Sequence, residues 1–555
     1  MEVAIDMSTD VRTFTRGELA QNVGTRLAED SRPSSDKMFV AIGGYVYDMT
    51  KFEKVHPGGK AVLRMVAGED ATEQFYALHN EDVLHKYHKK LCVGVLVDDG
   101  AKSSTTDLKL PAKTAEDLVS KVPYAEMPLM RPNWARSPWW NDSHREFLLG
   151  MRQILVSMLP EFTDCETSGE YVSSEMMQAL GAKGVLACLN GTAVMGVAQE
   201  LKDAGKLTFP GGLEPKSFDL WHEYIAFCEF ARTVPTGVRN GINGGMSISL
   251  PAIAQFWKHP NKDAVVEKIL LGQQTSCLAI SEPHAGSDVA NIVTQARRSQ
   301  CGKYYILNGI KKWITAGMTS DFFSTAVRTG GSGMSGMSFL LVDRNDPVTR
   351  EGVSVKHIKT SDAKAAATAW VYFDDAYVPV ENLMGKEGGG FKLMMYNFNH
   401  ERWLICAGVQ AGARKILEEC WLWCMQRMVF GKKLISQPVI RQKLGRMIAS
   451  VEAMEGYMDL ITYQMANMDP VAQGIELGGA IGLLKYQSTR MLTLMSDEAC
   501  QIFGGRALTA SGMGQRIETL QRTFKFASIL GGSEEIMVDL GVRQAMGSFP
   551  ANAKL

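Results

Sequence analysis

The sequence predicts a multidomain protein: a small α+β domain, then a helical domain, a β domain and a second helical domain. Three observations support this prediction. The length of 555 residues suits three or four folding units at roughly 150 residues each. The hydrophobic pattern changes from helical to strand-like near residue 273 and back to helical near residue 386. A polar, aperiodic stretch separates the small domain from the rest.

The expected boundaries are 11–98 for the small domain, 99–134 for a linker, 135–272, 273–385 and 386–548 for the three larger domains, and 549–555 for a tail.

The charge and composition argue against several classes of partner and location. A formal net charge of −1 provides no basic field for nucleic acid and no cluster for anionic lipid. There is no uninterrupted run of about 18 apolar residues, so no membrane span is expected. The acidic residues Glu2, Asp6 and Asp10 argue against a secretory or mitochondrial presequence. The ten cysteines include no Cys-x-x-Cys pair, and Cys420 and Cys424 lie in an apolar helical pattern, which indicates reduced core thiols in a reducing compartment.

The small domain carries two histidines in distinctive surroundings. Residues 39–48 read as strand, turn, strand, and His56 follows in the stretch His-Pro-Gly-Gly, whose glycines let the backbone approach a flat ligand. His79 comes 23 residues after His56. This arrangement resembles the cytochrome b5 haem-binding domain. The resemblance implies haem b, with His56 and His79 as axial ligands of the iron.

Two other roles for histidines in this domain fit the sequence less well. Zinc would need three or four nitrogen or sulfur ligands, and no cysteines accompany the pair. His85 and His88 compete as second ligands, but they lie among lysines and are expected at the surface. Two imidazoles on one iron leave no open coordination position, which indicates electron transfer and not oxygen activation.

The segment from Asp98 to Pro111 is polar and without periodicity, which predicts a flexible tether. It would hold the haem domain near the following domains at high effective concentration. The alternative is that the two modules are merely co-localised.

The stretch from Cys277 to Asp288 reads CLAISEPHAGSD and predicts a strand that ends in an exposed turn, although a plain loop or helix cap would look similar. Residues 304–315 read as a β-hairpin closed by a type I′ turn at Asn308-Gly309, with Trp313 and Thr315 at its end. Together these pieces resemble the flavin-binding signatures of the acyl-CoA dehydrogenase family. The resemblance extends over about residues 140–548 and implies an N-terminal all-α domain, a middle β domain and a C-terminal four-helix bundle.

Within that region the apolar pattern predicts particular elements. The stripe from Leu444 to Ile461 predicts one long helix. Further strands are expected at residues 277–280, 293–297, 339–342, 353–355 and 369–373.

The resemblance implies an oxidoreductase that converts an acyl-CoA thioester to the trans-2-enoyl-CoA with FAD. A carboxylate removes the α-proton and the β-hydrogen leaves as hydride. Many family members carry the catalytic glutamate where this chain has Gly531, whose backbone N–H can still bind the thioester oxygen. The long-chain and isovaleryl branches place the base on a helix, at the position of Glu401. The alternative is that Glu401 is an ordinary carboxylate paired with Arg402. His400 is expected to be neutral and on the adjacent helix face.

Further roles follow from the resemblance alone. The positions that would contact FAD are Leu278, Ala279, Ile280, Ser281, Ser287, Trp313, Ile314, Thr315, Arg427, Gln501, Gly504, Gly505, Ser533 and Glu535. The positions that would contact acyl-CoA are Ser287, Asn399, Arg402, Gly531 and Gly532. Because the family shares FAD between chains, a homodimer or homotetramer is implied.

The expected function is therefore acyl-CoA dehydrogenation, with long or branched chains favoured, in fatty-acid β-oxidation or in the biosynthesis of a specialised acyl metabolite. The electron acceptor is open: the chain's own haem domain, O₂ or a redox protein. Alternatives are a nitroalkane-oxidase-like flavoenzyme and a haem-bearing electron carrier. The final residues, Ala553-Lys554-Leu555, resemble a peroxisomal address and predict that location, with the cytoplasm as the alternative.

Overall fold

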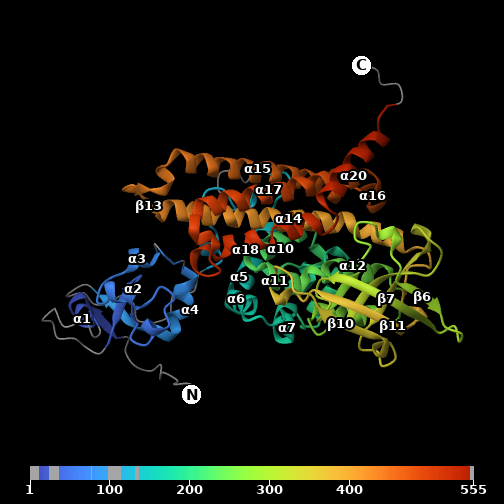
Figure 1. Cartoon of the computed structure of the whole chain (residues 1–555), viewed down its shortest axis with the longest axis horizontal. Helices are drawn as coiled ribbons and strands as arrows, with labels where there is room; N and C mark the ends of the chain where they lie inside the picture. Colours follow the sequence, from blue (N-terminus) through green and yellow to red (C-terminus); the bar gives the residue numbers. More distant parts are fainter. Residues whose placement is uncertain are drawn as a thin grey trace. The chain divides into compact units, whose positions relative to one another are not determined.

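A computed structural model describes residues 12–23, 37–76, 78–79, 81–97, 114–131 and 137–550 (Figure 1). The chain divides into two compact units: residues 1–113, 423–436 and 508–515 form the smaller, and the remainder forms the larger. Residues 99–113 of the predicted tether, and the last five residues with the peroxisomal-type signal, lie outside the described residues.

A four-stranded sheet with the order β1-β4-β3-β2 forms the centre of the smaller unit. β2 and β3 pair antiparallel around Gly43 and Gly44, whose φ angles of 60° and 83° form the tight turn that the sequence predicted. Leu63 and Leu84 pack with the strands in one buried core. The elements are β1 (Thr13–Thr15), α1 (Arg16–Gln21), β2 (Phe39–Ile42), β3 (Tyr45–Asp48), α2 (Lys60–Met65), α3 (Thr72–Tyr76), α4 (Glu81–Leu91) and β4 (Cys92–Val97).

The first part of the larger unit is helical, as the sequence predicted. Gly184, Gly191 and Gly211 have φ angles of 70°, 75° and 63°, and each lies at a break between helices. The helices are α5 (Asp142–Ser157), α6 (Leu159–Ser168), α7 (Ser174–Ala182), α8 (Val185–Cys188), α9 (Met195–Asp203), α10 (Leu220–Thr233), α11 (Thr236–Arg239), α12 (Met246–Phe256) and α13 (Lys262–Leu270), with a π-helical turn at Asn240–Gly244.

A sheet with the order β10-β11-β7-β6-β8-β9-β12 follows, and β5 pairs with β8 (Figure 1). All five separately predicted strands are present, but β8 was not predicted. Its sequence FFSTAVR is buried at six consecutive positions, so it shows no apolar–polar alternation. The strands are β5 (Ser276–Ala279), β6 (Gln295–Arg298), β7 (Tyr304–Ile314), β8 (Phe322–Arg328), β9 (Met337–Asp343), β10 (Val353–His357), β11 (Ala369–Pro379) and β12 (Leu383–Met384).

The predicted hairpin at Asn308-Gly309 is wrong, because β7 continues straight through both residues. Asn308 exchanges two hydrogen bonds with Asp375, of 2.8 and 2.9 Å, where the pairing with β11 is irregular. Gly309 is needed for close packing: a Cβ there would lie 2.6 Å from Thr294 Oγ1. The Asn-Gly pair therefore lies opposite an irregularity in β11 between Phe373 and Ala376 and is not a chain reversal.

Long helices form the C-terminal part, and α14, α15 and α17 lie side by side (Figure 1). The predicted stripe on α15 is confirmed, since Leu444, Val451 and Met458 are buried. Among the described residues, no helix has the length and apolar character that a membrane crossing needs. The helices are α14 (Gly390–Gln426), α15 (Pro438–Asn467), α16 (Pro470–Glu476), α17 (Gly478–Phe503), α18 (Gln515–Thr523), α19 (Lys525–Ile529) and α20 (Glu534–Gly547), and a hairpin of β13 (Met428–Val429) and β14 (Lys432–Lys433) follows α14.

Residues 114–131 belong to the larger unit, although the sequence analysis placed them in the linker. Arg152 on α5 donates hydrogen bonds to Glu126, at 2.7 and 2.8 Å, and to Glu229, at 2.7 and 2.6 Å. Arg131 binds Glu452 in the same way, at 2.9 and 2.7 Å. The linker prediction extended too far because these partners come from α5, α10 and α15 and are invisible in the local sequence.

Candidate functional site

A carboxylate, two cations and a glycine loop meet where α14 passes the connection between α19 and α20. Arg402 Nε donates to the carbonyl of Gly531 at 2.9 Å, and Lys485 Nζ donates to the carbonyl of Gly532 at 2.6 Å. Glu401 precedes Arg402 on α14. The structure thus brings together four of the residues implied by the family pattern, from segments 129 residues apart.

A side chain at position 531 would point to the place that the Glu401 carboxylate occupies. A Cβ on Gly531 would lie 3.6 Å from Glu401 Oε1. A glutamate at position 531 and the glutamate at 401 would therefore place their carboxylates in the same region. This geometry supports the hypothesis that a base on α14 takes the place of one in the loop.

Burial raises the pKa of Glu401 to about 7, against the opposing charges of Arg402, Lys485 and His400. A carboxylate with a pKa near neutrality is suited to taking up a proton at physiological pH. Burial also lowers the pKa of Lys485 to about 8.

His400 contacts a buried carboxylate. Its Nε2 lies 2.9 Å from Oε1 of Glu223 on α10, and Glu223 is almost fully buried. Burial alone would lower the pKa of His400, but the Glu223 carboxylate outweighs it and raises that pKa. Because the Nε2 atom of His400 is directed at the Glu223 carboxylate, Glu401 is the better candidate base.

The backbone N–H of Gly531 is available for a ligand. Among the described residues, no group accepts a hydrogen bond from it, although its carbonyl is bound by Arg402. An uncommitted N–H beside a carboxylate is what a site that stabilises a developing oxyanion requires.

The turn after β5 is shaped by a buried ion pair. Glu282 accepts the N–H groups of Val293 and Thr294, at 2.7 and 2.9 Å, and the Nζ of Lys311 at 2.8 Å. Beyond Glu282 the turn is exposed except at the buried Ala285, and within the described chain the N–H groups of its Gly286 and Ser287 have no acceptor. Such a turn presents backbone donors to an anionic group. The predicted residues Leu278, Ala279, Ile280 and Ser281 lead into it.

Trp313 and Thr315 lie at the end of β7, next to this turn, since Lys312 N–H donates to the carbonyl of Ser281 at 2.9 Å. Trp313 has a φ of 65° and keeps 52% of its surface exposed, whereas Ile314 is buried. An exposed indole, a hydroxyl and free backbone N–H groups fit a flavin ring with its diphosphate.

The other implied cofactor and substrate residues are spread over several elements. Ser533 caps α20 by accepting the N–H of Ile536 at 3.5 Å, and Asn399 accepts Arg402 Nη1 at 3.3 Å. The remaining residues are the exposed Ser287 in the turn, Gln501, Gly504 and Gly505 at the C-terminal end of α17, Glu535 in the first turn of α20, and Arg427 after α14 in the smaller unit.

In the smaller unit, His56 and His79 face each other with ring centroids 6.0 Å apart. Metal–nitrogen bonds of about 2.0 Å and about 1.1 Å from each nitrogen to its ring centre predict about 6 Å for two imidazoles on one metal ion. Burial and the neighbouring His56 lower the pKa of His79, which favours the neutral, ligating form.

The surroundings of this pair also fit a haem. His56 Nδ1 lies 3.3 Å from the carbonyl of Gly59, which orients the ring. A Cβ on Gly58 would come within 2.8 Å of the His56 ring, so glycine is required there. Val55 and Leu78 adjoin the two histidines with 70% and 42% of their surface exposed, the kind of apolar surface that a macrocycle covers.

The expectation that His88 is a surface residue is wrong. It is buried, and its Nδ1 lies 2.7 Å from the Tyr47 hydroxyl. The neighbouring lysines made an exposed position the expected one, but residue 88 lies on the face of α4 that packs on β3. The side chain of His85 lies outside the described residues.

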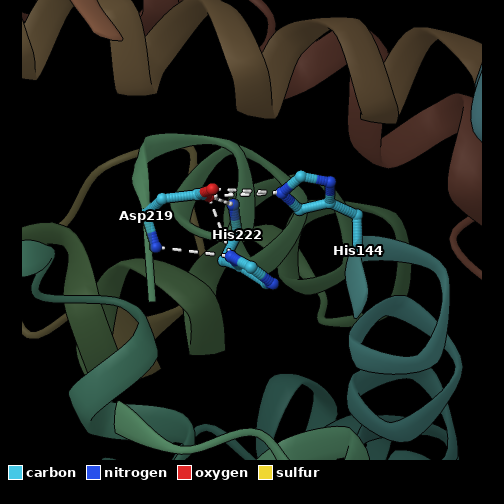
Figure 2. A group of neighbouring side chains, drawn as sticks. All are labelled: His144, Asp219 and His222. Atoms are coloured by element: carbon cyan, nitrogen blue, oxygen red, sulfur yellow. Dashed lines mark hydrogen bonds and ion pairs between the residues drawn. The ribbon is translucent and has the colours of Figure 1, made fainter. Parts of the chain in front are cut away.

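A separate group of titratable side chains lies at the starts of α5 and α10 (Figure 2). Asp219 lies 3.2 Å from His144 Nε2 and 2.8 Å from His222 Nδ1, close enough to suggest a metal site. However, Nδ1 of His144 accepts the N–H of Asn141 at 3.1 Å, so its proton is on Nε2, the atom a metal would need. The cluster instead closes the capping boxes of both helices.

The sequence analysis missed Lys485 and Glu223. The available signal for Lys485 was a lysine within the apolar stripe of α17, between Ile481 and Ser488, both buried. For Glu223 no local signal existed, because its partner His400 is on another helix.

Comparison with known protein families matches three segments of the chain. Residues 25–97 match the cytochrome b5-like haem/steroid binding domain. Residues 277–376 match the middle domain of acyl-CoA dehydrogenases, and residues 388–546 match their C-terminal domain.

Individual relatives agree with these matches. The acyl-CoA dehydrogenase apdG of Emericella nidulans is 36% identical over 79% of this chain and 98% of its own length. The human mitochondrial very long-chain specific acyl-CoA dehydrogenase is 29% identical over 57% of this chain and 47% of its own. The crystal structure of a probable acyl-CoA dehydrogenase from Mycobacterium abscessus matches with a TM-score of 0.64 and 27% identity, over 74% of this chain and all of that one.

Proposed function

Because the chain belongs to the acyl-CoA dehydrogenase family and carries a cytochrome b5-like domain, we propose that Glu401 is the base of an α,β-dehydrogenation of acyl-CoA thioesters. The family fold implies FAD, and the cytochrome b5-like domain implies haem. One observation carries the proposal: the carboxylate of Glu401 lies where a side chain at position 531 would point. In addition, burial raises the pKa of Glu401 to about 7.

The reaction begins when Glu401 takes the α-proton of the thioester. That proton is too weakly acidic for a carboxylate in water, so the site must raise the basicity of the carboxylate and stabilise the enolate oxygen. Burial provides the first requirement, and the free N–H of Gly531 provides the second. Arg402 contributes by holding the carbonyl of Gly531, so the loop has one conformation before substrate arrives.

When bound, FAD supplies the acceptor for the hydride that leaves the β-carbon as the carbon–carbon double bond forms. The exposed face of Trp313 and the hydroxyl of Thr315 would lie against the flavin, and the N–H groups of Gly286 and Ser287 would face an anionic group. Proton and hydride thus leave from adjacent carbons, and the product is a trans-2-enoyl thioester.

We also propose a long or branched acyl chain. A base on α14 is the arrangement of the long-chain and isovaleryl branches, and one relative is named as very long-chain specific. Such a reaction serves fatty-acid β-oxidation or the biosynthesis of a specialised acyl metabolite.

We propose that the haem domain takes the two electrons of the reaction one at a time and passes each of them on to a redox protein. A six-coordinate bis-histidine haem accepts single electrons and offers no open position for oxygen. The shared FAD of the family supports a homodimer or homotetramer, and the terminal Ala553-Lys554-Leu555 supports a peroxisomal location.

The test is to mix the purified protein with a long-chain acyl-CoA without oxygen and to follow flavin and haem absorption together. Flavin bleaching followed by haem reduction is the expected result. Bleaching with unchanged haem would move the acceptor to O₂ or a redox protein. No bleaching across a panel of acyl-CoAs would overturn the dehydrogenase assignment, and a protein without flavin would favour the electron-carrier alternative.

Two variants sharpen this test. Glu401→Gln should abolish bleaching while flavin stays bound. Glu419→Gln is the matched control, because Glu419 lies on the same helix but pairs with Lys415 and Arg516. A nitroalkane-oxidase-like enzyme would instead bleach with nitroalkanes and not with acyl-CoA.

A further inference from the structure

Lys485 is a buried cation with unusual surroundings. Its side chain has no exposed surface. The buried Arg152 and Arg414 each contact two carboxylates, whereas no ion pair in the described part of the chain includes Lys485. An ammonium buried without a carboxylate contact is strongly disfavoured. Its position on the apolar face of α17 therefore indicates that Lys485 has a role other than stabilising the fold.

The ammonium of Lys485 donates hydrogen bonds to α19 and to the loop between α19 and α20. Nζ donates to the carbonyl of Gly532 at 2.6 Å and to the carbonyl of Ala527 at 3.0 Å. Arg402 holds the preceding carbonyl, that of Gly531. Two cations from different helices thus fix two consecutive peptide groups, in a loop where Gly531 and Gly532 have φ angles of 65° and 106°.

This clamp bears directly on the candidate oxyanion donor. Glycines at positive φ can adopt many conformations, so the loop would not hold one orientation by itself. The N–H of Gly531 lies in the adjacent peptide group, between Leu530 and Gly531, and has no acceptor among the described residues. Holding the two following peptide groups restricts the rotation about Gly531 that would turn this N–H away. Preorganisation of such a donor is what makes it effective in a transition state.

The charge of Lys485 also reaches the candidate base. A Cβ on Gly531 would lie 3.6 Å from both Lys485 Cε and Glu401 Oε1, so these two atoms lie within about 7 Å of each other. The groups facing Glu401 are Arg402 and His400 on α14 and Lys485 on α17. Lys485 itself faces Cys406, Glu401 and Arg402 on α14 and Glu534 on α20.

We propose that Lys485 is a positioning residue for the dehydrogenation: it holds the loop so that the Gly531 N–H meets the thioester oxygen, and its positive charge sets the basicity of Glu401. This inference rests on the proposed function, in which Glu401 is the base.

The test compares the pH dependence of kcat/KM in three variants. Lys485→Met removes the charge and both hydrogen bonds, and should lower kcat about 10- to 100-fold. It should also shift the acidic limb of the kcat/KM profile to higher pH by about one unit, because a nearby cation no longer favours the ionised form of Glu401. Lys485→Gln keeps a donor for the loop but not the charge, so it should shift the limb equally and lose less kcat. Lys485→Arg keeps the charge, so it should return the acidic limb of the kcat/KM profile to the pH of the parent enzyme.

Lys443→Met is the control for simple loss of helix packing. Lys443 of α15 pairs with the buried Glu498 of α17, 13 residues and about 20 Å along the helix from Lys485. It should lower the unfolding temperature without moving the pH limb.

The outcomes separate the two proposals. If Lys485→Met and Lys485→Gln lower only the unfolding temperature and leave the acid limb in place, the role of Lys485 is structural and the inference is overturned. If Glu401→Gln keeps its activity, the base assignment itself fails, whatever Lys485 does. If Lys485→Met does not fold, Lys485→Gln carries the test alone.

Discussion

Moving the base from α14 to the loop tests the geometry at the centre of the site. The perturbation is Glu401→Ala combined with Gly531→Glu. Because a Cβ on Gly531 would lie 3.6 Å from Glu401 Oε1, a glutamate side chain, which extends beyond Cβ, reaches the place that the native carboxylate occupies. The double variant should therefore regain activity that Glu401→Ala loses.

The expected size of the rescue follows from two costs. A non-glycine residue at the φ of 65° is disfavoured by about 1–2 kcal/mol. Ile405 Cδ1, which would lie 2.8 Å from the new Cβ, must also move, and it is the flexible end of a side chain. A penalty of about 2 kcal/mol corresponds to roughly 30-fold in rate. Loss of a general base costs about 10²- to 10⁴-fold. We expect the double variant to remain about 30-fold below the parent and about 3- to 300-fold above Glu401→Ala.

The assay is the single-turnover rate of flavin bleaching by acyl-CoA without oxygen, with flavin content measured for each variant. The matched control is Glu401→Ala with Gly532→Glu, because a Cβ on Gly532 points at Met537 Cε, 2.5 Å away, and not at Glu401. Equal rates for both double variants, or no gain over Glu401→Ala in folded, flavin-loaded protein, would refute the reasoning.

Three further predictions concern stability and haem binding. Burial raises the folded-state pKa of Glu401 from 4.5 to about 7, so its ionisation lowers stability as pH rises through that range; Glu401→Gln should be more stable than the parent at pH 8, by up to about 3 kcal/mol, and equal to it near pH 4 in thermal unfolding. Arg152→Met should cost about 3–5 kcal/mol in denaturant unfolding, because the buried Glu229 loses its cation and the buried Glu126 keeps only Arg232, whereas Arg145→Met, at an exposed pair, should cost about 0–1 kcal/mol. His79→Ala should abolish the six-coordinate haem spectrum, while His88→Ala should keep that spectrum and lower the unfolding temperature of the haem domain; the reverse pattern would contradict the ligand assignment.

Features with local causes were predictable from the sequence. The Gly43-Gly44 turn between β2 and β3 depends on residues that tolerate positive φ, and the stripe on α15 depends on helical periodicity. The family signatures around Trp313 and Gly531 are also contiguous. For the same reason the order of helical, β and helical regions was correct.

The failures all depend on partners distant in the chain. Asn308-Gly309 looks like a hairpin turn, but Asp375 on β11 and Thr294 just before β6 decide its conformation. His88 looks exposed among lysines, but Tyr47 binds it in the core. In each case a tertiary contact overrode the local preference.

The sequence by itself determined which chemical groups are present: the two histidines of the cytochrome b5-like domain, the turn after β5, and a glycine at position 531, where the family resemblance implies a base. Only the tertiary structure decided how these groups act. It placed Glu401 within reach of Gly531, set Lys485 beneath the loop and committed His400 to Glu223. The physical reason is that basicity and preorganisation arise from burial and from charges a few ångströms away in space. Neither burial nor such charges can be inferred from the residues that are adjacent in the sequence.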